Sequence, residues 1–124
     1  MEELHDRVVR AIQNKLNQRD YDVYINPGQE KNAGINGNYP DVIMTEKGKT
    51  TVKFILEVEV AASVSQEEAE RQWKKYAQEI NATFYLVVPQ NLLTKAKQLC
   101  QNNNLSVRFA TFEERNGNIN FKFD

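Results

Sequence analysis

The sequence has little that could cross-link the protein, anchor it in a membrane or coat it with positive charge. Its single cysteine, Cys100, cannot form a disulfide within the chain, which fits a reducing compartment, so we expect a cytoplasmic protein. No run of about 18 apolar residues occurs and no signal sequence precedes the first expected helix, so neither a membrane span nor secretion is indicated. The net charge of −1 argues against a generally basic nucleic-acid-binding protein and leaves room for a local basic patch.

The composition is that of a globular protein. The chain has 124 residues, of which 40% are hydrophobic and 27% are charged, and this is enough to bury a sizeable core. The sequence contains no repeats, low-complexity tracts or linkers. We therefore expect a single domain over residues 1–124.

An apolar stretch at residues 52–60 is the most informative part of the sequence. Side chains alternate between the two faces of a strand, so its apolar residues should share one face. These are Val52, Phe54, Leu56, Val58 and Val60. Glu57 and Glu59 should then emerge side by side on the opposite face, about 7 Å apart. Like charges at that distance persist only if a cation, a base or water relieves their repulsion.

Apolar spacing and turn residues predict the remaining elements. We expect helices at residues 2–18, from Ser65 to about residue 81, and at about 92–102, with Ser65 and Glu68 forming a capping box at the second. Further strands are expected at 21–25, 40–44, 83–88, 105–112 and, as an edge strand, 118–123. Residues 29–39 read as a flexible loop, either a binding segment or a plain connection. The order αβββαβαββ predicts an α/β sandwich with a central mixed sheet.

The turn at 47–49 makes the strands on either side of it antiparallel neighbours. Asp41, at the start of one strand, should therefore lie across from the end of the other, where Glu57 and Glu59 lie. This pairing predicts three carboxylates at one end of the sheet. Gln72 lies on the inward stripe of the following helix, where it either bonds the backbone as a core residue or serves a site.

These features occur in a recognisable order: a first helix, Pro40-Asp41, a hairpin, Glu57-Val58-Glu59, and a helix that carries Gln72-Trp73-Lys74-Lys75-Tyr76. The order resembles the PD-(D/E)xK nuclease superfamily, and the spacing of Gln72 and Tyr76 is similar to its exonuclease and RecB-type branch. The likeness extends from the first helix to the strand at 83–88. It implies a restriction endonuclease-like α/β/α fold.

The resemblance also implies a site and a reaction. Asp41, Glu57 and the backbone carbonyl of Val58 match the ligands of a Mg²⁺ or Mn²⁺ ion, and Gln72 matches an accessory residue. The expected reaction is hydrolysis of phosphodiester bonds in DNA or another nucleic acid by a metal-activated water, in an endo- or exonuclease. The resemblance is compatible with a homodimer and gives no reason to expect a membrane partner.

The chain departs from the family at Glu59, where the motif usually has lysine. Glu59 could be a further metal ligand or a general base, or a displaced lysine such as Lys53 or Lys75 could replace the missing one. Alternatively the site is inactive, and the chain is a pseudonuclease that binds nucleic acid or a protein partner. A plainer interpretation makes Glu57 and Glu59 solvated rim residues of an interaction domain.

Other side chains could join this site. His5 lies where superfamily members often carry an acid or histidine on the first helix, and it is either a ligand or substrate contact or an ordinary helix-end histidine. Basic side chains on the helices could contact phosphates or could simply be solvated. They are Arg7, Arg10, Lys74, Lys75, Lys95 and Lys97.

Overall fold

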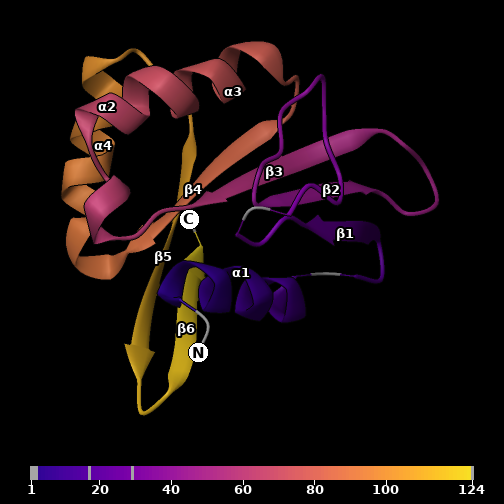
Figure 1. The fold of residues 1–124 in the computed structure, drawn as a ribbon, viewed down its shortest axis with the longest axis horizontal. Helices are drawn as coiled ribbons and strands as arrows, with labels where there is room; N and C mark the ends of the chain where they lie inside the picture. The colour runs from indigo at the N-terminus through magenta and orange to yellow at the C-terminus, as the bar shows by residue number, and fades with distance from the viewer. Residues whose placement is uncertain (1–2, 17, 29, 124) are drawn as a thin grey trace.

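The computed structural model of the chain describes residues 3–16, 18–28 and 30–123, and it shows a mixed α/β fold around one curled six-stranded sheet (Figure 1). The strands are β1 (Tyr21–Ile25), β2 (Val42–Glu46), β3 (Val52–Val58), β4 (Thr83–Pro89), β5 (Arg108–Arg115) and β6 (Asn118–Phe123), in that order across the sheet. The pairs β3–β4 and β4–β5 are parallel and the other three are antiparallel. The predicted element order is confirmed.

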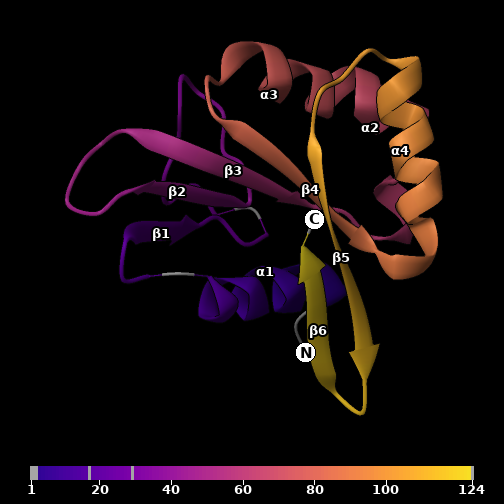
Figure 2. The ribbon, with the colours of Figure 1, turned by 180° about the vertical axis from the view of Figure 1, so that it is seen from behind.

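Helices cover both faces of this sheet (Figures 1 and 2). The two parallel crossovers step across the sheet in the same direction, so their right-handed connections place their helices on the same face. These helices are α2 (Gln66–Glu68), α3 (Lys74–Glu79) and α4 (Leu93–Asn102). The opposite face is left to α1 (Leu4–Lys15), which buries Val8, Val9 and Ile12 against it.

The strand β3 separates two apolar clusters as its alternation predicts. Leu56 and Val58 pack on the α1 side of the sheet, whereas Ile55 packs on the side of α2, α3 and α4. Glu57 therefore faces the second layer, like Ile55. Val52 is an exception to the predicted faces, because it packs with the second cluster, next to a register shift in the β2–β3 pair between Met44 and Thr45.

Several predicted boundaries differ from the structure. The first helix begins at Leu4 and ends at Lys15, and Glu2 and Asn17 lie outside the described residues, as does Gln29 at the start of the predicted loop. The strands predicted at 40–44 and 105–112 begin two and three residues later, at Val42 and Arg108. Among the described residues, no helix combines the length and the apolar character needed to cross a bilayer.

The helix predicted from Ser65 is interrupted. The Ser65 hydroxyl accepts a 3.2 Å hydrogen bond from the Glu68 N–H, as the predicted cap requires. A π-helical turn, η2 (Ala69–Trp73), then separates α2 from α3. Such turns often occur at functional sites because the extra residue changes which side chains face inward. Here the turn contains Gln72.

Candidate functional site: buried carboxylates at the β2–β3 edge

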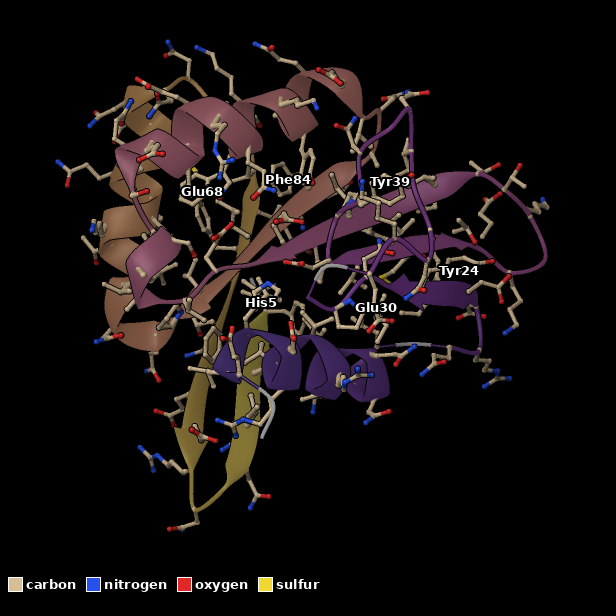
Figure 3. The ribbon with its side chains drawn as sticks, viewed as in Figure 1. His5, Tyr24, Glu30, Tyr39, Glu68 and Phe84 are labelled. Atoms are coloured by element: carbon tan, nitrogen blue, oxygen red, sulfur yellow. The ribbon has the colours of Figure 1, made fainter. Side chains whose placement is uncertain are left out.

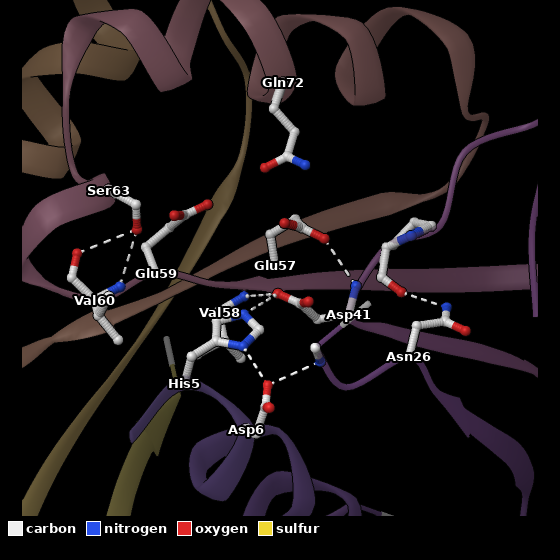
Figure 4. Close-up of polar contacts among 12 residues, drawn as sticks. His5, Asp6, Asn26, Asp41, Glu57, Val58, Glu59, Val60, Ser63 and Gln72 are labelled. Carbon is white, nitrogen blue, oxygen red and sulfur yellow. Dashed lines mark hydrogen bonds and ion pairs between the residues drawn. The ribbon is translucent and has the colours of Figure 1, made fainter. Parts of the chain in front are cut away.

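Asp41 and Glu57 lie opposite each other where β2 begins and β3 ends (Figure 4). Val42 pairs with Leu56, and the same register carried one residue further places Asp41 across from Glu57. The Glu57 Oε1 atom accepts a 2.8 Å hydrogen bond from the Asp41 N–H, and the Asp41 Oδ2 atom accepts one of 2.8 Å from the Val58 N–H. Both residues are buried, with 8% and 4% of their surface exposed. The predicted approach of these two acids is confirmed.

The residue across from Val58 in the β2–β3 register is a proline. One further step in the β2–β3 register places Pro40 across from Val58. On a strand, the N–H and C=O of one residue point to the same side, and the Val58 N–H points to Asp41. Proline has no N–H to donate, so Pro40 cannot satisfy the Val58 carbonyl. The Val58 N–H bonds Asp41 Oδ2, so the backbone of Val58 lies beside this carboxylate.

Burial and repulsion disfavour the charged form of Glu57. Desolvation raises the pKa of Glu57 well above its ordinary value, and the charges of Asp41 and Glu59 raise it further. None of the lysine and arginine ion pairs found among the described residues involves any of these three acids. A hard cation bound by two carboxylates and a carbonyl would relieve this repulsion, and oxygen ligands are those that Mg²⁺ and Mn²⁺ prefer. Asp41, Glu57 and Val58 therefore fit such an ion.

Gln72 reaches this pair from the π-helical turn. With its amide nitrogen turned toward the acids, Gln72 donates to Glu57 Oε2 at 3.2 Å and to Glu68 Oε2 at 2.9 Å. The Tyr76 hydroxyl lies 3.4 Å from the side-chain amide of Gln72. The predicted inward Gln72 thus has a side-chain partner in the site, and the alternative of a core glutamine bonded only to the backbone does not hold.

Glu59 faces a different partner. Its Oε1 atom accepts a 2.8 Å hydrogen bond from the indole N–H of Trp73, which is fully buried. Burial raises the pKa of Glu59 to about 7, against the lowering effect of bonds from Ser63 and Trp73. Within the described ranges, no group of three or more Asp, Glu, His or Cys side chains is placed to hold a metal ion. Glu59 lies near enough for its charge to raise the pKa of Glu57, as three carboxylates at one end of the sheet require, but it is bound to Trp73 and is not grouped with Asp41 and Glu57 around one ion.

His5 approaches Asp41 from the other side of the sheet (Figures 3 and 4). Its Nε2 atom lies 3.1 Å from Asp41 Oδ2, and its Nδ1 atom lies 2.9 Å from Asp6 Oδ1. The bond to Asp41 is the main cause that raises the pKa of His5 to about 9, so the imidazole is a cation at neutral pH. Asp6 also accepts a 2.9 Å bond from the Gly28 N–H. Sequence reasoning singled out His5 and missed Asp6.

Asn26, the residue that follows the strand predicted at 21–25, holds the loop that leads into the site. Its side-chain nitrogen donates to the carbonyls of Ala33 and Pro40, each at 2.7 Å. Its oxygen accepts from the N–H groups of Asn32 and Ala33 at 2.8 and 2.9 Å. The only signal in the sequence is a polar residue after a strand, which does not reveal four bonds to the backbone of residues 32, 33 and 40.

A pocket of about 160 Å³ opens over the acidic pair. It is lined by Asn26, Gly28, Glu30, Lys31, Tyr39, Asp41, Glu57 and Gln72. A second pocket of about 300 Å³ shares Tyr39 and Gln72 and adds Arg71 and Lys75. Lys53 is not a displaced lysine of this site, because it lies near the other end of β3, 3.6 Å from Glu46.

The other basic residues named from the sequence contact other parts of the structure. Arg7 pairs with Glu114, and Lys97 lies over the ring of Phe109. Arg10 lies 3.9 Å from Glu30, which lines the 160 Å³ pocket. Lys75 is therefore the member of the predicted basic set that lines a pocket adjoining the acids.

Comparisons with known proteins do not assign the chain to a family. No family model, no curated protein and no solved structure matches it.

Proposed function

We propose that this protein is a metal-dependent nuclease that hydrolyses phosphodiester bonds in DNA or another nucleic acid. The observation that supports this most is the pairing of Asp41 and Glu57 beside the backbone of Val58, in the lining of a pocket. The same pairing, the order of elements and the helices on both faces of the sheet support a restriction endonuclease-like fold of the PD-(D/E)xK type. Cys100 is free and buried, which agrees with a cytoplasmic protein.

Asp41, Glu57 and Val58 would hold Mg²⁺ or Mn²⁺. When bound, such an ion supplies a nucleophilic water and offsets the charge that develops on the scissile phosphate. The surrounding residues position these ligands. Gln72 orients the Glu57 carboxylate through Oε2, and the Asp41 N–H fixes its Oε1 atom.

Two further hydrogen bonds fix acidic side chains at or next to the site. His5 holds Asp41 at Oδ2, the atom that also accepts from Val58. Trp73 donates to Glu59 and keeps this side chain directed at the π-helical turn rather than at the ion. Glu59 is therefore a buried carboxyl group behind the site, in place of the usual motif lysine.

One observation favours a second candidate function. Glu59 stands at the position of the motif lysine and is bound to Trp73, and the three acids lack a lysine or arginine ion-pair partner among the described residues. This arrangement suits a catalytically inactive pseudonuclease that binds nucleic acid or a protein partner. In that case binding would need no divalent ion and would survive the loss of Asp41.

A nuclease assay separates the two functions. Purified protein is incubated with supercoiled, linear, single-stranded and RNA substrates in Mg²⁺, Mn²⁺ or EDTA. We expect hydrolysis only with a divalent ion, and a loss of at least about 100-fold in Asp41→Asn and Glu57→Gln, because each removes a charged ligand. Glu113→Gln, which changes a partly exposed glutamate on β5, is the matched control and should retain full activity. Binding that is unchanged in Asp41→Asn, without hydrolysis of any substrate, would support the pseudonuclease instead.

The same preparations test for a homodimer. Sedimentation of the protein with and without nucleic acid shows whether two copies associate, as enzymes that cut two strands commonly do. This result concerns the assembly and does not change the assignment of Asp41 and Glu57.

A further inference from the structure

The carboxylate pocket continues into a basic one at Tyr39 and Gln72. Asp41 and Glu57 line the 160 Å³ pocket, and Arg71 and Lys75 line the 300 Å³ pocket. The acids and the two basic side chains are therefore separated by one tyrosine ring and one amide. A phosphodiester chain needs this arrangement of charge where one phosphate lies at an ion site and its neighbour requires cations from the protein.

The Tyr39 ring is exposed and yet held by its surroundings (Figure 3). Of its surface, 36% is accessible, which places it among the most exposed large hydrophobic side chains of the described residues. The ring packs so closely on Gly34 that a Cβ atom there would lie 2.7 Å from Tyr39 Cε1. The ring therefore packs directly on the backbone of Gly34, and a side chain at position 34 would displace the ring.

The segment before Tyr39 is anchored as well. Ile35 and Asn38 exchange backbone hydrogen bonds of 2.8 and 2.9 Å, with a turn at Asn36 and Gly37, where φ is positive. The buried Asn38 side chain donates to Glu79 on α3 at 3.2 Å. An aromatic ring presented in this way loses little freedom when a planar group stacks on it.

One basic side chain lies over the Tyr39 ring, and two more line a pocket that the ring shares. The Lys31 ammonium lies 5.3 Å from its centroid, within the range of a cation–π contact. Arg71 is mostly exposed, although it pairs with Glu68, and Lys75 has no ion-pair partner among the described residues. An aromatic platform with basic side chains around it is typical of surfaces that bind single strands, because every base has a face that can stack.

We propose that the nucleic acid is single-stranded where it meets this site, with one base stacked on Tyr39 and a flanking phosphate bound by Arg71 and Lys75. A stacking base displaces the Lys31 ammonium from the ring, and this cation remains close enough to pair with the backbone. Bases of a duplex are covered by their neighbours and cannot stack on the ring. This inference rests on the proposed nuclease function, because it places the next phosphate of the strand at Asp41 and Glu57.

The test is binding measured without hydrolysis. Fluorescence anisotropy in EDTA compares labelled oligothymidylate with the same strand in a duplex. The wild-type protein should bind the single strand more tightly. Tyr39→Ala should weaken this binding about 5- to 100-fold, which is the range for loss of one stacked base. Tyr39→Phe should retain it. Tyr24→Ala is the matched control, because Tyr24 is exposed and lines neither pocket.

The phosphate contacts have a separate readout. Lys75→Gln and Arg71→Gln should each reduce the slope of log affinity against log salt by about one. Lys95→Gln, which changes an exposed helical lysine on α4, should leave the slope unchanged.

Different results would overturn the placement of the strand and the nuclease function. Equal or tighter binding of duplex, or single-strand binding that Tyr39→Ala does not change, would overturn the placement of the strand. Metal-dependent cleavage of duplex by Tyr39→Ala at the wild-type rate would also overturn it, while the nuclease function stood. Single-strand binding that depends on Tyr39, with no hydrolysis in Mg²⁺ or Mn²⁺, would support the placement and overturn the nuclease.

Discussion

The Asp41 N–H donates a 2.8 Å hydrogen bond to the Glu57 carboxylate, which joins two acids from neighbouring antiparallel strands. The bond is possible because Asp41 lies one residue before the first ladder pair of β2, where its N–H is free to bind a side chain. A buried carboxylate gains about 1.5–3 kcal/mol from a hydrogen bond of this kind. The remaining charge of the pair is what a bound cation would neutralise.

Removing the charge of Glu57 should therefore stabilise the metal-free protein. Glu57→Gln keeps the shape of the side chain and ends the repulsion with Asp41, so the melting temperature in EDTA should rise by about 3–5 °C for each kcal/mol gained. The increase in melting temperature that Mn²⁺ gives the wild-type protein should disappear. Differential scanning fluorimetry measures both effects, with Glu113→Gln as control. A variant that melts lower in EDTA and still responds to Mn²⁺ would contradict the role given to Glu57.

The pKa of Glu59 predicts how stability changes with pH. Folding raises this pKa from 4.5 to about 7, so the folded state binds a proton that the unfolded state has released between these values. The resulting stabilisation is complete below about pH 4.5 and is lost as the pH rises through about 7. The raised pKa of His5, from 6.5 to about 9, acts in the same direction at higher pH.

Urea unfolding in EDTA at several pH values tests this. The free energy of unfolding of the wild-type protein should fall between pH 5 and pH 8 by an amount on the order of 2–3 kcal/mol more than that of Glu59→Gln. Parallel curves for the two proteins would show that Glu59 does not take up the proton.

Asn26 should stabilise both the loop and the site. Its side chain makes four hydrogen bonds, to the backbone of residues 32, 33 and 40, and only 3% of its surface is exposed. Asn26→Ala leaves these backbone groups without partners, so we expect a loss of about 2–4 kcal/mol in the free energy of unfolding. Asn120→Ala changes an exposed asparagine on β6 and should cost little. Similar losses in the two variants would rule out the anchoring role.

Much of the fold could be predicted from the sequence because its signals are local. Apolar residues at helical or alternating spacing located the elements, and the turn at 47–49 fixed the antiparallel pairing that brings Asp41 to Glu57. The boundaries were less certain, because β5 continues to Arg115 beyond the apolar run that predicted it.

The parts that could not be predicted depend on distant partners. An extra residue in the π-helical turn leaves no mark in the apolar spacing, so the sequence placed Gln72 near the acids but did not reveal the bond from Trp73 to Glu59. The four bonds of Asn26 reach a segment whose path the sequence does not encode locally. The bond from Trp73 to Glu59 could not be predicted either, since alternation places Glu57 and Glu59 on one face and says nothing of Trp73.

Cys100 should be inert in the folded protein. It is buried in the cluster under α4, and desolvation raises the pKa of its thiol to about 11. Because the thiolate is the reactive form, labelling by a disulfide reagent at pH 8 should be slow in buffer and fast in denaturant. Rapid labelling of the native protein would show that α4 is not packed as described.

The most direct test of the site is a crystal of the wild-type protein soaked in Mn²⁺ and measured for anomalous scattering. We predict a single strong peak bound by the carboxylates of Asp41 and Glu57 and by the carbonyl of Val58, at distances of about 2.0–2.6 Å, and no peak in Asp41→Asn crystals. Wild-type crystals in which Mn²⁺ is absent from these three residues, or lies at other acids instead, would contradict the account.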